Sequence, residues 1–161
     1  MSDEPHISAA PVAADVLAAG ADLAQVLDRL LRRHANLTLA QYRVLDALQR
    51  RRPEPTEPRD LTGELRMSSA HLSAVLDQLE QRTLVHRRPH PDDGRRRLLE
   101  LAREGAERLD HFAPFIGALE GRVVGSNLSE DESRTLRALL GRVRAALDGV
   151  VIPDGRPRPG P

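Results

Sequence analysis

Apolar residues recur along most of this chain at the spacing of one face of an α-helix. The first such stretch runs from Val12 to His34, and its apolar positions include Val16, Leu23, Leu27, Leu30 and Leu31. This period predicts one long amphipathic helix. Other apolar surface has to cover a stripe of this length, so we expect the helix to serve an interface.

A second helix is predicted from Thr38 to about Arg50. Thr38 and Gln41 have the spacing of a capping box, and apolar positions follow at Leu39, Tyr42, Val44, Leu45 and Leu48. The segment 50–58, RRRPEPTEP, then ends the helix, because its prolines cannot lie inside one. We expect this segment to be an exposed loop.

Two helices separated by a tight turn follow this loop. A short helix is predicted at about Arg59–Leu65, and a longer one from Ser68 or Ser69 to about Arg82. The longer helix would bury one apolar face, formed by Leu72, Val75, Leu76 and Leu79. A short helix, a tight turn and a longer helix make up a helix-turn-helix.

A β-hairpin is predicted next. Its strand-like runs are LVHRR at residues 84–88 and RRRLLELA at residues 95–102. The segment between them, PHPDDG at residues 89–94, is rich in residues that form turns. A hairpin in this position is the wing of a winged helix-turn-helix.

The rest of the chain is predicted to be helical. A stretch from about Arg103 to Val124 contains Pro114, which should kink or split it. The last helix opens with Ser129 and Glu132 in capping-box spacing, and it should bury the stripe formed by Leu136, Leu139, Leu140, Val143 and Leu147.

The predicted fold class is therefore mainly α with a small β-hairpin wing (α+β), a winged helix-turn-helix flanked by long helices. The winged helix-turn-helix domain occupies residues 37–103, and the flanking helical region occupies residues 12–36 and 104–150. The proline-containing ends, residues 1–11 and 151–161, are predicted to be disordered tails.

Composition removes several classes of function. The chain has no cysteine, which excludes disulfides, thiolate metal ligands and thiol nucleophiles. All 24 basic side chains are arginine, so the lysine of a phosphate-binding P-loop or of a Schiff-base enzyme is missing. Two histidines with HxxxH spacing, His86 and His90, lie in the predicted hairpin and not on one face of a helix, so they do not form a helical metal motif. We predict no enzyme, no metal and no cofactor.

The N-terminus carries acidic residues where a signal peptide would be basic, and no apolar run is long enough to cross a bilayer. We therefore expect a cytoplasmic protein without a membrane partner.

Charge is distributed unevenly, although the net charge of the chain is zero. Residues 38–103 carry a net charge of +3, and residues 82–97 contain six arginines against Asp92 and Asp93. Clustered arginine favours contact with phosphate, whereas a solvated surface is the alternative for this segment taken alone. One tyrosine and two phenylalanines are too few to stack unpaired bases, so the nucleic acid expected is duplex DNA.

These elements, in this order, resemble the MarR family of bacterial winged helix-turn-helix transcriptional regulators. The segments that carry the resemblance are LTLAQYRVLDAL (37–48), DLTGELRMSSAHLSAVLDQLEQRTLVHRR (60–88), PHPDDGRRRLLELAREG (89–105) and LSEDESRTLRALL (128–140). The resemblance implies a homodimer in which residues 12–36 and 104–150 form the dimerisation region and residues 37–103 bind double-stranded DNA.

The resemblance also implies the DNA contacts. The helix from Ser68 to Arg82 would enter the major groove, where the residues facing the bases would be Ser69, His71, Ser73, Ala74 and Gln78. Ser68 or Ser69, at the helix start, would contact a phosphate. Arg95, supported by Asp93, would enter the minor groove from the hairpin tip, and Arg87 and Arg96 complete the set.

The chain departs from the family pattern at four positions, one of which, Ala102, replaces a frequent threonine at the start of the next long helix and so removes a likely N-cap hydroxyl. Thr83 stands where glycine usually follows the recognition helix, so the turn there must be less typical. Ala74 replaces a frequent arginine, and His71 replaces a small hydroxyl residue. We therefore expect its base readout to differ from that of its relatives.

The resemblance further suggests a small aromatic or anionic effector beside His34, Tyr42, His111, Phe112 and Phe115, although a role of these residues in packing is the favoured interpretation. The predicted function is a ligand-responsive repressor that binds a pseudo-palindromic duplex site as a homodimer. The alternatives are a winged-helix adaptor that binds protein, which the arginines 95–97 oppose, and a small helical enzyme.

Overall fold

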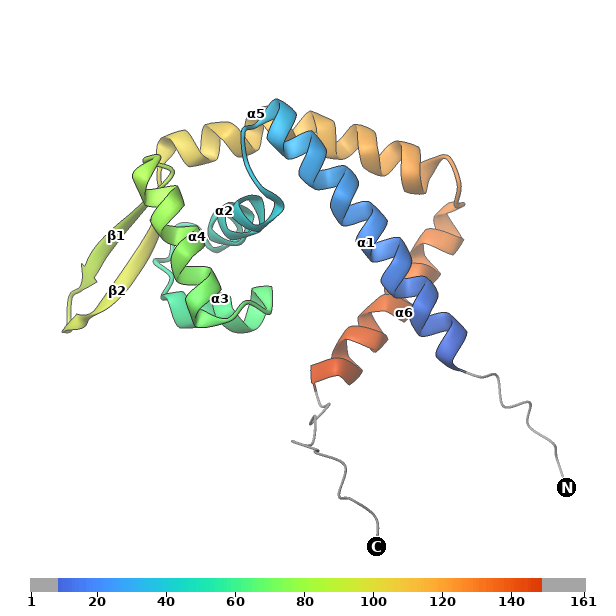
Figure 1. Ribbon diagram of the computed structural model, residues 1–161, viewed down its shortest axis with the longest axis horizontal. Helices are drawn as coiled ribbons and strands as arrows, with labels where there is room; N and C mark the ends of the chain where they lie inside the picture. Colours follow the sequence, from blue (N-terminus) through green and yellow to red (C-terminus); the bar gives the residue numbers. More distant parts are fainter. Residues whose placement is uncertain (1–8, 149–161) are drawn as a thin grey trace, which may run out of the picture. The chain divides into compact units, whose positions relative to one another are not determined.

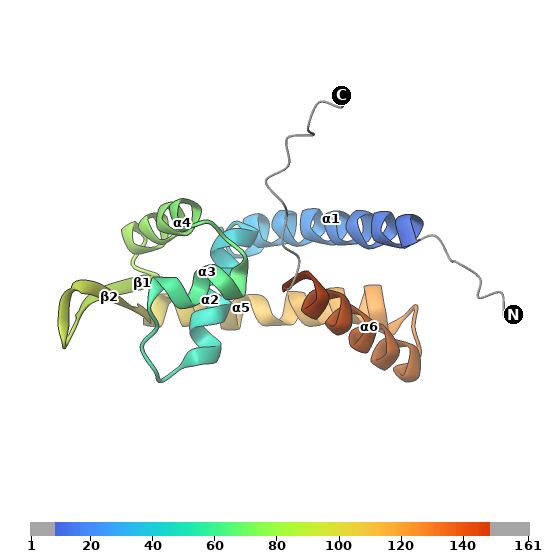
Figure 2. The ribbon, with the colours of Figure 1, turned by 90° about the horizontal axis from the view of Figure 1, so that it is seen from below.

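The computed structural model describes residues 9–148, which divide into one unit that ends at Phe115 and a second that begins at Ile116 (Figures 1 and 2). The predicted tails, residues 1–11 and 151–161, lie outside the described residues except for positions 9–11. Those three positions open the first helix.

The first unit has the predicted order of elements. Helices α1 (Ala9–His34), α2 (Leu39–Arg51), α3 (Pro58–Leu65) and α4 (Ser69–Gln81) precede the hairpin of β1 (Val85–His90) and β2 (Asp93–Leu101), and α5 (Arg103–Glu120) follows it. This order confirms the mainly α fold class with one hairpin.

The start of α2 is fixed by the predicted capping box and by α1. The Gln41 N–H donates to Thr38 Oγ1 over 3.1 Å, and the Thr38 N–H donates to Gln41 Oε1 over 3.0 Å. The Leu39 N–H donates to Asp28 Oδ1 over 2.8 Å. Hydrogen bonds from Arg32 and from this N–H lower the pKa of Asp28, so its carboxylate stays ionised at neutral pH and ties α1 to α2.

The core of the first unit lies where α2, α3, α4, the base of the hairpin and the start of α5 meet. The predicted apolar face of α4 is buried in it, as Leu72, Val75, Leu76 and Leu79 show. The largest buried side chain is Phe112 of α5, which has no exposed surface. Burial of this kind supplies most of the stability of a small helical domain.

The hairpin differs from the prediction in its turn and in its surroundings. Strand β1 continues to His90 and β2 begins at Asp93, so the turn is much shorter than residues 89–94. Thr56 also pairs with Leu99 of β2, through main-chain hydrogen bonds of 3.3 and 2.8 Å, and is buried. The segment 50–58 was therefore wrongly expected to be exposed throughout, because Thr56 forms an isolated β-bridge to β2 and is buried.

Thr83 adopts the left-handed conformation that its place after α4 requires, with φ of 56°. The Thr83 N–H donates to Glu80 O and the Leu84 N–H donates to Leu79 O, each over 2.9 Å, which is the Schellman pattern. A β-branched residue in this conformation costs about 1–2 kcal/mol. The turn after α4, where the resemblance predicts glycine, thus keeps its left-handed conformation with threonine, and this lowers the stability of the fold.

Of the predicted kink or split at Pro114, the split is wrong, because α5 runs unbroken to Glu120 and continues as a π-helical segment, Gly121–Gly125. The apolar stripe of α6 (Glu130–Asp148), which was expected to be buried, is left exposed by the single chain. The predicted cap of α6 is confirmed, since the Glu132 N–H donates to Ser129 Oγ over 3.3 Å and the Ser129 N–H to Glu132 Oε2 over 2.8 Å.

Gly105, in the first turn of α5, sets how closely that helix approaches the hairpin. A Cβ atom on Gly105 would lie 2.4 Å from the Leu84 carbonyl oxygen and 2.7 Å from Leu101 Cδ1. The same Leu84 oxygen accepts a hydrogen bond of 3.1 Å from the Ala102 N–H. A side chain at position 105 would therefore push α5 away from the base of the hairpin.

We predict that Gly105→Ala lowers the free energy of unfolding by about 1–3 kcal/mol, because the added methyl group overlaps main-chain atoms that cannot move aside. Gly117→Ala is the matched control in the same helix, where a Cβ atom meets nothing within 4 Å. It should be neutral or stabilising by up to about 1 kcal/mol. Urea denaturation measures both variants, and equal effects would contradict this account of Gly105.

Candidate nucleic-acid interface

Helix α4 presents the predicted base-facing residues on its solvent side. Its apolar face is buried, and the residues left exposed on the remaining surface include Ser69, His71, Ser73, Ala74 and Gln78. The structure thus brings these positions together on one helix surface, free to meet a partner.

Ser68 is the N-cap of α4, and its Oγ accepts the His71 N–H over 3.2 Å. This answers which serine starts the helix, because Ser69 is the first helical residue. The Ser68 hydroxyl already serves the helix end, so a phosphate bound there would meet main-chain N–H groups as well as this side chain.

The C-terminal half of α4 is tied to α2 by polar side chains. The Gln41 Nε2 donates to Gln78 Oε1 over 3.0 Å, and Arg82 Nη1 donates to Gln41 Oε1 over 3.2 Å. Gln41 is buried, although its side chain is polar. Gln78 is therefore exposed but held in one orientation by α2.

Two arginines bind the carbonyl oxygens at the end of α1. Arg82 Nη2 donates to Asn36 O over 2.6 Å, and Arg108 Nη1 donates to Ala35 O over 2.8 Å. Burial, together with the charge of Arg108, lowers the pKa of Arg82. Arg82 belongs to the basic cluster of residues 82–97 in the sequence, whereas in the structure it anchors the end of α4.

The arginines of the hairpin fall into two groups. Arg87 pairs with Asp77 and Glu80 of α4 at 2.6 and 2.9 Å, Arg88 pairs with Glu100 at 2.9 Å, and Arg96 pairs with Glu57. Arg95 and Arg97 have no carboxylate partner within the described residues 9–148. Of the arginines expected to bind DNA, only Arg95 is thus a cation without a counter-charge, because Arg87 and Arg96 are committed to acids.

Asp93 supports the main chain of the hairpin turn rather than the side chain of Arg95. Its Oδ1 accepts the Arg95 N–H over 2.9 Å. The Arg95 side chain is exposed beyond this turn, and the hairpin projects away from α3 and α4 (Figure 1). This placement fits a contact with a groove that the helices do not enter.

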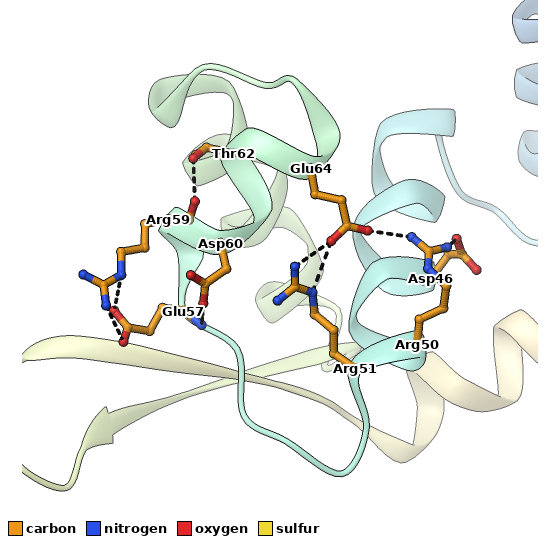
Figure 3. Close-up of polar contacts among 8 residues, drawn as sticks. All are labelled: Asp46, Arg50, Arg51, Glu57, Arg59, Asp60, Thr62 and Glu64. Atoms are coloured by element: carbon orange, nitrogen blue, oxygen red, sulfur yellow. Dashed lines mark hydrogen bonds and ion pairs between the residues drawn. The ribbon is translucent and has the colours of Figure 1, made fainter. Parts of the chain in front are cut away.

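Helix α3 is held to α2 by a set of ion pairs that sequence reasoning missed (Figure 3). Glu64 Oε1 accepts from Arg50 Nη2 over 2.8 Å, and Glu64 Oε2 accepts from Arg51 Nη2 over 2.7 Å. Arg51, followed by Arg50, lowers the pKa of Glu64. The spacing from residue 50 to residue 64 crosses a loop, so no local pattern could have indicated these contacts.

The residues proposed to line an effector site do form one aromatic cluster. The ring centroids of His34 and Phe115 lie 4.2 Å apart in a stacked arrangement, and those of Tyr42 and Phe112 lie 5.8 Å apart edge to face. His111 lies 6.3 Å from Phe115. Burial raises the pKa of Tyr42, and the nearby charge of Asp46 raises it further, so its hydroxyl is neutral at physiological pH.

A cavity of about 280 Å³ adjoins part of this cluster. Its lining residues are His34, Ala35, Glu104, Glu107, Arg108 and His111. Tyr42, Phe112 and Phe115 are not among them, and Phe112 is fully buried. The structure thus places two of the predicted effector residues at a cavity and uses the other three for packing.

Within residues 9–148, no helix is long and apolar enough to cross a membrane. The same residues contain no cluster of histidine, aspartate and glutamate side chains suited to holding a metal ion.

Comparison with known proteins gives relatives of one family. The model of the MarR family matches residues 37–96. The regulator PecS of Dickeya dadantii is 31% identical over 76% of this chain and 74% of the relative. The multiple antibiotic resistance protein MarR of Escherichia coli is 31% identical over 74% of this chain and 83% of the relative.

Solved structures with the same fold include a MarR family regulator and a protein–DNA complex. AbsC, a MarR family regulator from Streptomyces coelicolor, superposes with a TM-score of 0.79 at 21% identity, over 92% of this chain and 100% of that one. The S. aureus MepR–DNA complex gives 0.72 at 23% identity, over 82% and 93%. At these identities the structures establish the fold.

Proposed function

This chain belongs to the MarR family of transcriptional regulators, and we propose that it represses transcription by binding a pseudo-palindromic duplex DNA site as a homodimer until a small ligand releases it. Members of this family are regulators and not enzymes. A DNA partner implies the cytoplasm as the location of this activity.

The proposal rests on one observation: an exposed surface of α4 adjoins a hairpin that carries arginines without carboxylate partners in the described residues. Helix α4 exposes Ser69, His71 and Ser73, and the adjoining hairpin carries Arg95 and Arg97, which lack carboxylate partners in the described part of the chain. Small polar groups on a helix suit the edges of bases in the major groove. An unpaired guanidinium suits the negative potential of a narrow minor groove.

Homodimerisation follows from apolar surface that a single chain leaves uncovered. On α1, Val16 and Leu23 are 41% and 43% exposed, and on α6, Leu139 and Leu147 are 48% and 54% exposed. Soluble monomers rarely expose stripes of this kind. A twofold dimer would place two α4 helices in successive major grooves, with half-sites about one helical turn, ~10 base pairs, apart.

Repression and its release would follow from this geometry. A dimer on its site blocks access to that stretch of DNA, and a ligand that favours another spacing of the two α4 helices weakens binding to both half-sites. The cavity beside His34 and His111 offers a small aromatic or anionic ligand aromatic edges and the guanidinium of Arg108, with the carboxylates of Glu104 and Glu107 on the same lining.

We predict that the protein sediments as a dimer, at twice the chain mass of 17.8 kDa, at micromolar concentration. Leu139→Glu should shift it to monomer, because a charge enters the apolar stripe of α6. Ala138→Glu adds the same side chain on the opposite, exposed side of that helix and should leave the dimer intact. A wild-type monomer would contradict the dimer.

We predict that Arg95→Ala weakens DNA binding and flattens its salt dependence, because each subunit loses one contact of the hairpin cation. Arg88→Ala removes the same charge from an arginine that already pairs with Glu100, so its effect should be smaller. His71→Ala and Ser73→Ala should instead change which bases are tolerated, at about 1–3 kcal/mol per lost base contact.

Binding to duplexes selected from a randomised pool, measured by fluorescence anisotropy over a range of salt concentrations, distinguishes these effects. If folded Arg95→Ala keeps the wild-type affinity and salt slope, the hairpin does not bind DNA. A winged-helix adaptor that binds protein would then be the better account.

We predict that His34→Ala and His111→Ala reduce the response to small aromatic carboxylates, because both residues border the cavity. Tyr42→Ala should act more weakly, through the packing of Phe112. His86→Ala, which replaces an exposed histidine of the hairpin outside this cavity, is the control. Release of DNA on titration with a panel of such carboxylates is the measurement, and an unchanged response in all variants would remove the pocket from the proposal.

A further inference from the structure

The carboxylate of Glu57 joins the start of α3 to the hairpin. Arg96 Nε donates to Glu57 Oε2 over 3.0 Å, and Arg96 Nη2 donates to Glu57 Oε1. Arg59 Nε lies 3.1 Å from Glu57 Oε2. The Glu57 side chain is only 15% exposed, so this two-point pair with Arg96 is better ordered than an ordinary surface ion pair.

This pair extends an attachment that begins at the base of the hairpin. Thr56 pairs with Leu99 through main-chain hydrogen bonds in both directions. Glu57 follows Thr56, and Arg96 precedes Leu99 on β2, so the ion pair lies nearer the tip than the main-chain pair does. The attachment of β2 to the helices therefore reaches to the residue next to Arg95.

Each strand of the hairpin carries an arginine whose ion pairs attach it to a helix. Arg87 on β1 pairs with Asp77 and Glu80 of α4, and Arg96 on β2 pairs with Glu57 at α3. Side chains alternate between the two faces of a strand. Arg95 and Arg97, which flank Arg96, therefore point away from the face that Arg96 turns toward α3.

We propose that Glu57 and Arg96 are positioning residues: their ion pair fixes the direction of the hairpin relative to α4, so that Arg95 meets DNA while α4 occupies the major groove. This inference rests on the proposed DNA binding. It removes Arg96 from the predicted DNA contacts and gives an acidic residue, which the sequence analysis did not single out, a role in DNA affinity.

The physical reason is that a two-stranded hairpin is marginally stable by itself and takes its orientation from what it packs against. The part of the hairpin between Leu99 and the tip extends beyond the main-chain hydrogen bonds of Leu99 with Thr56. Without the Glu57 carboxylate, the tip would sample more directions, and fixing it on DNA would cost conformational entropy.

The sign of the effect separates this inference from simple electrostatics. Removing an acidic side chain beside bound DNA raises the positive charge of the protein and should strengthen binding. Loss of a positioning contact should weaken it. Glu57→Gln keeps the shape of the side chain and removes its charge, so the direction of the change in Kd decides between the two.

We expect Glu57→Gln to weaken binding to the duplex that wild-type protein selects from a randomised pool by about tenfold, equivalent to losing about one good contact. Glu54→Gln is the matched control. It removes the same charge from the same loop at an exposed side chain with no ion pair to the hairpin, and should leave binding unchanged or slightly tighter. Binding of Glu57→Gln that equals or exceeds wild type overturns the inference.

A second comparison asks whether the effect passes through Arg95. Arg96→Gln and the double variant Glu57→Gln/Arg96→Gln should both match Glu57→Gln, since each breaks the same pair. In an Arg95→Ala background, Glu57→Gln should cause no further loss, whereas general destabilisation would weaken binding in either background. Thermal unfolding of every variant confirms that it is folded at the temperature of the assay.

The outcomes also separate this inference from the proposed function. Wild-type protein that binds no duplex DNA overturns both. Wild-type protein that binds DNA, with Arg96→Gln weaker and Glu57→Gln tighter, makes Arg96 a DNA contact and overturns the positioning role alone.

Discussion

A two-stranded hairpin has no stable orientation of its own, and the interface described here depends on how the helices hold it. At its base, Leu84 O accepts the Ala102 N–H, and Gly105 lets α5 approach that same oxygen. Nearer the hairpin tip, Thr56 and Leu99 are joined by main-chain hydrogen bonds. These contacts use backbone atoms, so they position the hairpin whatever its surface residues are. The side chains then decide what the hairpin can bind.

Carboxylates divide the arginines of this chain into structural and available ones. Glu64 holds Arg50 and Arg51, Glu57 holds Arg96, and Asp77 with Glu80 holds Arg87. This explains how a protein with zero net charge can still present cations to DNA. Its acids neutralise the arginines that support the fold and leave Arg95 exposed without a partner in the described residues. Local placement of charge, rather than its sum, governs the electrostatics of binding.

The stability of the chain is linked to its proposed assembly. The first unit has a buried core around Phe112 and Leu76, whereas its helix α1 and the helix α6 of the second unit expose apolar stripes. Thr83 adds a strained turn at the end of α4, directly before the hairpin. A fold that keeps such strain and such exposed surface fits a protein that is stabilised by a partner subunit, because association with the folded state alone raises its stability.

The sequence by itself determined which elements form. The period of Leu72, Val75, Leu76 and Leu79 predicted the buried face of α4. The capping boxes at Thr38 and Ser129 marked two helix starts. These signals depend on neighbours within one or two turns. The exposure of His71 and Ser73 followed from the same period. The unbroken course of α5 past Pro114 did not, since the local rule allowed either a kink or a split there.

Only the tertiary structure decided which charges remain available. Arg95 and Arg96 are neighbours in the sequence and identical in chemistry, yet Arg96 meets Glu57 across 39 residues while Arg95 meets solvent. Likewise, His34 and His111 are far apart in the sequence, yet both line the same cavity. The energy of an ion pair depends on the distance between its atoms in space. The number of residues between two side chains does not determine that distance, which is set only when the chain folds.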